Sequence, residues 1–262
     1  MKVAIIGGTG LYDSGLVAGI QREIVETPYG RVALLTGALE NGREIVFLAR
    51  HGEGHSVPPH RVNYRANIAA LKKIGAEAIL ATAAVGSLNR AMAPGNLALV
   101  DQFLDFTKSR PMTFFEGGET GVVHIDMTEP YCPELRRTLA EAASSIPGLI
   151  VHRSGTYVCT EGPRFETPAE IEMFRRLGGD IVGMTGVPEV VLAREAGICY
   201  AAVAVITNYA AGLAGVALSH AEVVAKVGQQ SGSLKELLLK AAAELPVERR
   251  CQCRNIPEAI KL

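Results

Sequence analysis

CYAAVAVITNYAAG, residues 199–212, is a continuous apolar run that ends abruptly in Thr, Asn and Tyr. Five other runs of this kind also end in small, hydroxyl-bearing or charged residues: VAIIGGTGL from Val3, EIVFLARHGEGH from Glu44, AILATAAVGS from Ala78, GTYVCTEGPRFET from Gly155 and DIVGMT from Asp180. Buried strands have such composition, and ligands of α/β sheets bind beyond strand ends. Six ends at one edge would form a single pocket lined by Thr, Arg, His, Glu, Met and Asn, which suits an anion and a polar heterocycle.

Helical patterns alternate with these runs. Apolar periodicity, proline at the first helical turn and a Thr-Pro-Ala-Glu start predict helices at 62–76, 133–146, 167–177, 188–196 and 220–245. This alternation favours an α/β fold with a central mixed, largely buried β-sheet flanked by helices. No linker interrupts the chain, so we expect one domain over 1–262 with a C-terminal helical region at about 220–245. Residues 108–129 have little periodicity and predict a long loop.

Composition excludes several classes of protein. The 262 residues include 26 basic and 27 acidic side chains, a balance that gives no electrostatic footprint for nucleic acid. Absence of Trp disfavours a base-stacking platform for single strands. There is no signal-peptide pattern and no uncharged apolar stretch that would span a bilayer, so we expect a cytoplasmic protein that does not bind membranes.

The five cysteines indicate reduced side chains packed as small apolar groups. Four of them are Cys132, Cys159, Cys199 and Cys251, and the last, Cys253, forms a C-x-C pair with Cys251. A structural zinc site needs four ligands, and the sequence shows no second cluster beside this pair. We therefore predict that the chain holds no metal ion.

Four strand ends carry groups that suit an anion. The Gly7-Gly8-Thr9-Gly10 turn is incomplete as a dinucleotide fingerprint, yet it offers backbone N–H groups and the Thr9 hydroxyl. Arginine binds phosphate oxygens through two parallel hydrogen bonds, which makes Arg50 an anion candidate, and the neighbouring His51 adds a donor. Thr82-Ala83 and Thr185 repeat the pattern. Singly, each feature also fits a tight turn, a surface pair or a helix cap; together they favour an anion site.

The chain contains, in this order, GGTGL, RHGxxH, VNYRAN, ATAAVGSL, DQFLDFT, EGPRFET, GMTxxPEVxLARE and TNYAAG. From Val3 to about Leu245 it resembles the trimeric purine nucleoside phosphorylase and methylthioadenosine phosphorylase family. The resemblance implies phosphate-dependent cleavage of a purine N-glycosidic bond in purine salvage, by a homotrimer or a dimer of trimers. It implies no cofactor beyond inorganic phosphate as co-substrate, and Met184 beneath the ribose. By the same resemblance the phosphate would be held by Thr9, Arg50, His51, Thr82, Ala83 and Thr185.

The base-binding residues indicate the branch of this family. Where the methylthioadenosine branch has a D-Y-D pattern, this chain has Asn208-Tyr209-Ala210. A 6-oxopurine offers an O6 acceptor and an N1–H donor; the amide of Asn208 would donate to O6 and accept from a protonated N7, and Glu166, preceded by Phe165, would accept N1–H. We therefore expect Asn208 and His51 to be catalytic. The alternatives without a role in binding are that Asn208 forms a turn after the last strand and that Glu166 is a solvated carboxylate at a helix start.

The 5′ substituent of the substrate stays open. His220, followed by Ala221, resembles the histidine that reaches the 5′-hydroxyl in ordinary purine nucleoside phosphorylases. His124 instead resembles a histidine of the methylthioadenosine branch that reaches a neighbouring subunit's site. Apolar Val216, Leu218 and Val223 would line a thioether pocket or simply pack as helix core.

The sequence thus predicts an enzyme for 6-oxopurine nucleosides: inosine, guanosine or 5′-methylthioinosine. S-methyl-5′-thioadenosine phosphorylase is the alternative within the family, and a non-catalytic purine-binding protein is the alternative outside enzymes. A hydrolase would leave Arg50 and the threonines without an anion to hold. The broken glycine pattern disfavours a NAD-dependent oxidoreductase.

Overall fold

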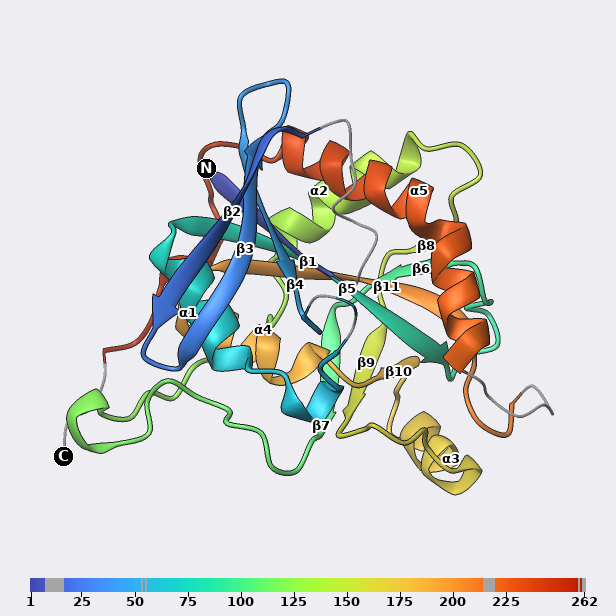
Figure 1. Cartoon of the computed structure of the whole chain (residues 1–262). Helices are drawn as coiled ribbons and strands as arrows, with labels where there is room; N and C mark the ends of the chain where they lie inside the picture. The colour runs from blue at the N-terminus through green and yellow to red at the C-terminus, as the bar shows by residue number, and fades with distance from the viewer. Residues whose placement is uncertain (8–16, 53, 55, 214–219, 259, 261–262) are drawn as a thin grey trace.

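The computed structural model describes residues 1–7, 17–52, 54, 56–213, 220–258 and 260, and of residues 220–223 it describes the backbone alone. One sheet of eleven strands forms its centre, with helices on both faces (Figure 1). The strands are β1 (Lys2–Gly7), β2 (Ala18–Thr27), β3 (Gly30–Ala38), β4 (Glu44–Ala49), β5 (Ala76–Ser87), β6 (Leu97–Leu99), β7 (Gln102–Phe106), β8 (Val151–His152), β9 (Thr156–Thr160), β10 (Ile181–Gly183) and β11 (Cys199–Tyr209).

The sheet is mixed, as the sequence predicts. Its main path runs β2-β3-β4-β1-β5-β10-β9-β7, and β11 pairs with both β5 and β6. The pairs β1–β4, β1–β5, β5–β11 and β9–β10 are parallel, whereas β2–β3, β3–β4, β5–β10 and β6–β11 are antiparallel. All six apolar runs therefore belong to one sheet, and four of them, β1, β4, β5 and β11, end toward the same edge.

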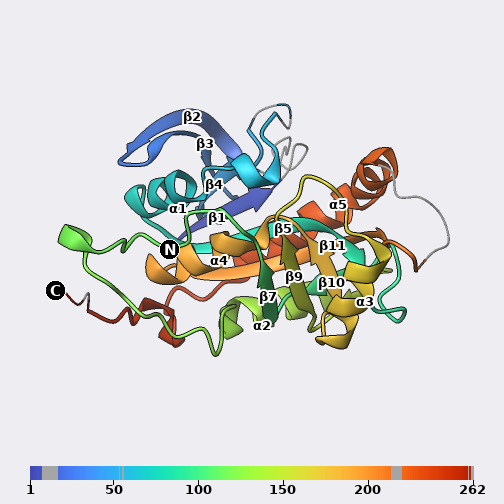
Figure 2. The ribbon, with the colours of Figure 1, turned by 90° about the horizontal axis from the view of Figure 1, so that it is seen from below.

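Two layers of helices cover the sheet. In Figure 1, α2 and α5 lie above it and α1 and α4 below, while α3 lies at the opposite end of the molecule from β2 and β3, as Figure 2 also shows. The α-helices are α1 (Tyr64–Lys73), α2 (Pro133–Ser144), α3 (Pro168–Arg176), α4 (Gly186–Glu195) and α5 (His220–Glu244), and short 3₁₀ turns are η2 (Pro59–Arg61), η3 (Gly118–Thr120) and η4 (Gln252–Arg254). The five predicted helices are confirmed.

Each face of the sheet has its own apolar core. One core joins alternate residues of β1, β4 and β5 to α1 and α4, for example Ile6 and Leu48 to Ile68 and Val190. The other joins the opposite residues of the same strands to α2 and α5, for example Ile5 to Leu139. Because successive side chains of a strand point to opposite faces, a continuous apolar run is what two covered faces require. None of the described helices is long and apolar enough to cross a membrane.

Residues 108–129 form the predicted loop, with η3 as their only described helical turn. Buried Arg110 anchors its beginning by donating to the carbonyls of Val187 at 2.6 Å and Glu161 at 2.8 Å. The carboxylate of Glu195 in α4 accepts hydrogen bonds from the Thr113 hydroxyl and the Phe114 N–H at 2.7 and 2.8 Å. These contacts tie the loop to the strand ends and to α4, next to the candidate site.

Candidate functional site

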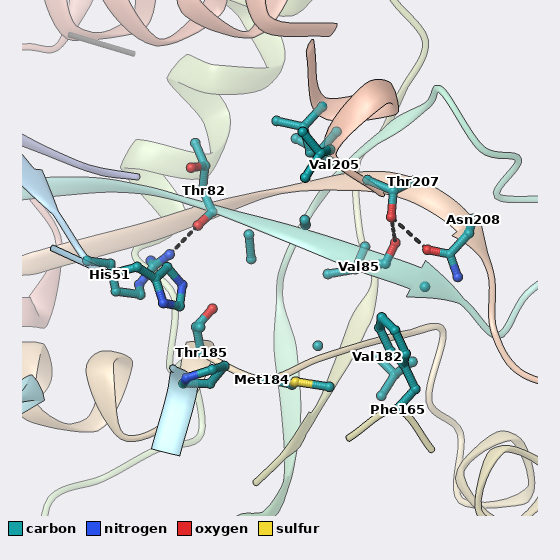
Figure 3. Close-up of a pocket in the computed structure, with 18 of the residues that line it drawn as sticks. His51, Thr82, Val85, Phe165, Val182, Met184, Thr185, Val205, Thr207 and Asn208 are labelled. Atoms are coloured by element: carbon teal, nitrogen blue, oxygen red, sulfur yellow. Dashed lines mark hydrogen bonds between the residues drawn. The ribbon is translucent and has the colours of Figure 1, made fainter. Parts of the chain in front are cut away.

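A cavity of about 730 Å³ lies where the predicted strand ends meet. Figure 3 shows two groups of side chains in it: His51, Thr82 and Thr185 lie at one end, and Asn208, Thr207 and Phe165 at the other, with Met184 between them. We name these ends the charged end and the amide end. The cavity wall includes Arg50, His51, Thr82, Ala83, Gly86, Phe165, Glu166, Met184, Thr185, Val205, Thr207, Asn208, Ala210, Val224, Val227 and Leu234.

The charged end is built around a buried ion pair between Arg50 and Glu189. Arg50 follows β4, and its Nε and Nη2 atoms both donate to the Glu189 carboxylate at 2.7 Å, while Nη1 donates to the Thr82 carbonyl at 2.6 Å. Burial alone would lower the pKa of Arg50, but Glu189 outweighs that effect and raises it. A guanidinium has five N–H groups, so these three bonds leave two others for a ligand. The fork of Arg50 therefore faces Glu189 rather than the cavity.

Glu189 was missed by the sequence analysis. It lies in α4, is fully buried and also accepts a hydrogen bond from the hydroxyl of Tyr200 at 2.8 Å. A signal for it does exist in GVPEVVLARE, where a carboxylate stands among apolar residues of a short helix. A buried carboxylate requires a cation and hydrogen-bond donors, so this position predicts a buried partner such as Arg50.

Four other residues predicted to hold the anion line the cavity at this end: His51, Thr82, Ala83 and Thr185. His51 lies against the cavity, and its Nδ1 lies 2.8 Å from the Val57 carbonyl, which accepts only, so Nδ1 carries the proton. Thr185 precedes the first turn of α4, and its backbone N–H donates to the Tyr157 hydroxyl at 3.1 Å. The prediction that Thr82 and Ala83 lie at a strand end is wrong. They lie within β5, which continues to Ser87.

Met184 lies midway along the cavity wall, where the backbone comes close. A Cβ added to Gly162 would lie 2.6 Å from the sulfur of Met184, and Gly162 has a φ of +67°. Only glycine fits this position without strain. The glycine of the EGPRFET segment thus lets the loop after β9 approach Met184, whose apolar side chain lines the cavity.

A β-bulge directs Asn208 into the cavity. In the β11–β5 pairing, Ile206 is opposite Val85 and Asn208 is opposite Gly86, so Thr207 is an extra residue. Side chains alternate along a regular strand, so Thr207 and Asn208 would otherwise face opposite sides. With the bulge both line the cavity. The close approach of Gly86 makes room for the amide, since a Cβ on Gly86 would lie 3.3 Å from Asn208 Nδ2.

Hydrogen bonds fix the orientation of the Asn208 amide. Its Nδ2 donates to the Tyr209 carbonyl at 2.9 Å, and its Oδ1 accepts from the Thr207 hydroxyl at 2.7 Å (Figure 3). A carbonyl accepts only, so the nitrogen must be the atom that faces Tyr209. One N–H and one lone pair of the amide remain for a ligand. This pair is what the O6 and protonated N7 of a 6-oxopurine would require.

Glu166 completes the amide end. It follows β9, is 9% exposed, and accepts a hydrogen bond from the Thr160 hydroxyl at 2.7 Å. Burial raises the pKa of its carboxyl, and the bond from Thr160 partly offsets this. Phe165, 39% exposed, presents its ring across the cavity from Asn208 (Figure 3). An apolar ring, an amide and a carboxyl together form a site for a flat, hydrogen-bonding heterocycle.

Of the remaining residues predicted to bind the substrate, only Ala210 is seen to line the cavity in the described part of the chain. Tyr209 points its hydroxyl to the Arg90 carbonyl at 3.4 Å and does not line the cavity, whereas Ala210 does. His124 is exposed in the loop and does not line the cavity of its own chain. Thr9, Val216 and Leu218 lie outside the described residues, as do the side chains of three others: His220, Ala221 and Val223.

Comparisons with known proteins agree with this geometry. Residues 2–243 match the family described as the Phosphorylase superfamily. A "Probable 6-oxopurine nucleoside phosphorylase" of Moorella thermoacetica is 56% identical over 97% of this chain and 96% of its own length. A "Probable S-methyl-5'-thioinosine phosphorylase" of Methanothermobacter thermautotrophicus is 45% identical over 97% and 88%. A solved methylthioadenosine phosphorylase of Schistosoma mansoni in complex with adenine is 36% identical, with a TM-score of 0.88 over 95% of this chain and 93% of its own.

Proposed function

We propose that this chain, which belongs to the Phosphorylase superfamily, is a phosphate-dependent 6-oxopurine nucleoside phosphorylase. It cleaves the bond between C1′ and N9 and releases the purine base and a ribose 1-phosphate. The observation that carries this proposal is the fixed Asn208 amide, which presents one N–H and one lone pair to the cavity beside Glu166. An aspartate there would present two acceptors, which suits a 6-aminopurine instead.

Hydrogen bonds at the amide end stabilise the purine as it leaves with the electron pair of the broken bond. As the C1′–N9 bond breaks, the electron pair moves into the purine, N7 takes up a proton from water, and the new N7–H donates to Asn208 Oδ1; the attacking hydrogen phosphate releases one proton to water as ribose 1-phosphate forms. The N–H of the same amide donates to O6, where negative charge accumulates. These bonds strengthen as charge develops, so they stabilise the transition state more than the bound nucleoside. A 6-amino group would leave the amide N–H without an acceptor, which a buried site penalises strongly.

The phosphate occupies the charged end. The two N–H groups of Arg50 that remain beyond its bonds to Glu189 and Thr82, together with His51 and the Thr82 and Thr185 hydroxyls, suit a phosphate dianion. The anion attacks C1′ from the face opposite the base and stabilises the cationic sugar. Glu189 compensates the charge of Arg50, so the main role of Glu189 is to hold the guanidinium in place.

A panel of nucleosides tests the reaction and the substrate class. Inosine, guanosine, adenosine and the two 5′-methylthio analogues, methylthioinosine and methylthioadenosine, are incubated with the enzyme with and without phosphate, and base release is followed by chromatography. Hypoxanthine and guanine released only with phosphate support the proposal. Base release without phosphate would show a hydrolase, and faster release of adenine would show a methylthioadenosine phosphorylase. Tight binding of purine without turnover would show a binding protein.

The variant Asn208→Asp tests the residue that sets the base preference. We expect kcat/KM for inosine to fall and that for adenosine to rise, because the carboxylate accepts from N6 and cannot donate to O6. The matched control is Asn89→Asp, since Asn89 donates to Asp180 at 3.0 Å outside the cavity. An unchanged preference in Asn208→Asp contradicts the proposed role of the amide.

A second substrate, 5′-methylthioinosine, is favoured by the wall that α5 contributes. Val224, Val227 and Leu234 line the cavity there, with Ser231 as the polar side chain among the described lining residues of α5. An apolar wall gains more from a methylthio group than from a hydroxyl. The ratio of kcat/KM for methylthioinosine to that for inosine tests this preference, and Val227→Ser should lower it. A ratio that Val227→Ser does not change assigns the 5′ contact to another residue.

We also propose that the enzyme is a homotrimer in which His124 completes a neighbouring site. Its exposure, away from the cavity of its own chain, supports this arrangement. Light scattering after size exclusion measures the oligomeric state. Mixing His124→Ala chains with Asn208→Ala chains should then restore part of the activity, because one mixed site keeps both residues. No restoration in a mixed trimer contradicts the role of His124.

A further inference from the structure

Four of the five cysteines meet at a place the sequence analysis did not foresee. The sulfurs of Cys132, Cys199, Cys251 and Cys253 all lie within 4.8 Å of one another. Three of these side chains are buried and Cys251 is half-buried. The premise that the C-x-C pair lacks a second cluster is therefore wrong, because the fold brings two distant cysteines to it.

We propose that these four cysteines bind a structural zinc ion. Tetrahedral zinc has Zn–S distances of about 2.3 Å, which places neighbouring sulfurs about 3.8 Å apart. The sulfurs of Cys199 and Cys251 are 3.3 Å apart, and every other pair is within 4.8 Å, so small shifts produce the tetrahedron. Thiolates are soft ligands that select zinc among common divalent ions, and four of them close the coordination shell, as structural sites require.

The surroundings compensate the negative charge of such a site. The Arg249 guanidinium donates to the Cys199 sulfur at 2.8 Å. Cys132 is the residue before the first turn of α2, where the helix dipole is positive. Nine-tenths buried Arg194 lies near Cys253, and its Nε has no hydrogen-bond partner in the described part of the chain.

The site would tie the end of the chain to the body of the protein. Cys132 precedes α2, Cys199 begins β11, and Cys251 and Cys253 flank the start of η4. The ion would link Cys199 to Cys251, which are 52 positions apart in the sequence, and restricting long loops is what makes a cross-link stabilising. Cys199 and Asn208 lie at opposite ends of β11, roughly 30 Å apart. The ion is therefore structural and takes no part in catalysis.

Metal content of the intact enzyme tests the proposal. The protein is prepared under reducing conditions with zinc supplied. Bound zinc is measured by inductively coupled plasma mass spectrometry, and free thiols are counted by alkylation in denaturant with and without a chelator. We expect one zinc ion per chain, one thiol (Cys159) that alkylates on unfolding alone, and four more that alkylate only when a chelator is added to the denaturant. Cobalt in place of zinc should give the visible absorption of a tetrahedral thiolate site. A metal-free chain, or cysteines joined as disulfides in place of bound metal, overturns the proposal.

Single substitutions locate the ion. Cys251→Ser, at the least buried of the four positions, should lose zinc and lower Tm, with kcat/KM unchanged at a temperature where it is folded. The matched control is Cys159→Ala, the buried fifth cysteine, whose sulfur contacts the Val187 backbone instead; it should keep zinc. If Cys251→Ser does not fold, the cobalt spectrum of the intact enzyme decides. Zinc retained in Cys251→Ser at full stoichiometry contradicts the assignment.

Discussion

The two ends of the cavity contrast in how their polar groups are bonded. At the charged end, Glu189 is fully buried, and Arg50 directs three N–H groups to protein acceptors. At the amide end, Asn208 is half-buried and keeps one donor and one acceptor beyond its internal bonds. The charged end is held rigidly by its own ion pair, whereas the amide end keeps hydrogen-bonding capacity for the ligand.

This contrast separates stability from specificity. Phosphate, which we propose binds at the charged end, is the same in every reaction of this class, so a site for it gains from groups fixed in advance. Discrimination between purines needs groups that the right base satisfies and the wrong base leaves unpaired. We therefore expect substitutions at the charged end to affect folding most, and substitutions at the amide end to affect the reaction.

The largest effect on stability is expected for Glu189→Gln. This change leaves the buried Arg50 charge without its carboxylate, so the free energy of unfolding should fall by about 3–5 kcal/mol. Urea denaturation measures it. The control Glu172→Gln removes a half-exposed carboxylate bonded to Arg175 and Arg176, and should cost less than about 1 kcal/mol. Equal losses in the two variants would erase the contrast between a buried and a surface pair.

Asn208→Ala should have the largest effect on the reaction. Removing the amide that we propose bonds O6 and N7 is expected to lower kcat/KM for inosine by about 10²–10³-fold, with little change in the free energy of unfolding. Steady-state kinetics with saturating phosphate measure the loss. As a control, Asn89→Ala should lose stability but not activity, since Asn89 bonds Asp180 away from the cavity. A small kinetic effect of Asn208→Ala would place the catalytic group elsewhere.

Thr207→Val should have a smaller effect, because it removes the hydroxyl that contacts Asn208 Oδ1 and the Val85 carbonyl but leaves the Asn208 amide in place. We expect kcat/KM to fall roughly fivefold to tenfold, equivalent to about 1 kcal/mol for one hydrogen bond, with the preference for inosine over adenosine kept. Thr138→Val, a buried change in α2, is the matched control for stability. A loss as large as that of Asn208→Ala would mean that Thr207 contacts the substrate itself.

The smallest effect is expected for the pH dependence of stability at Glu166. Its pKa is raised above the usual 4.5 by burial, so the folded state binds the proton more tightly than the unfolded chain. The free energy of unfolding should therefore decrease as the pH rises from the ordinary carboxyl range through the raised pKa. Glu166→Gln removes that cost and should gain of the order of 0.5 kcal/mol at neutral pH. Denaturation curves over a pH series measure it.

Glu161→Gln is the control with the opposite sign. Burial favours the protonated form of Glu161, but hydrogen bonds from the Lys108 N–H and the Ser109 hydroxyl outweigh it and lower the pKa. Its contribution to stability is present above the usual carboxyl pKa and is lost as the pH falls through the lowered value. The same pH trend in both variants would contradict the assignment of burial as the dominant cause at Glu166.

Much of the fold and part of the site were predictable from local patterns. The apolar runs, the proline and threonine helix starts and the residues after each strand gave the sheet, the helices and the meeting of Arg50, His51, Glu166 and Asn208 at one cavity. The positions of Thr82 and Ala83 within β5 were missed, because strand length depends on pairing with β11 and β10. The roles of the individual residues in phosphate and base binding stay predictions.

The sequence by itself determined the elements and the chemical inventory, because periodicity and strand-end composition are local properties of the chain. Only the tertiary structure decided which groups are partners. Arg50 and Glu189 are 139 residues apart, the β11 bulge that directs Asn208 exists only in the pairing with β5, and the four cysteines come from three separate segments. Contacts of this kind depend on how strands and helices pack across the whole chain, so a local pattern such as GVPEVVLARE indicates that a partner is needed but not which residue it is.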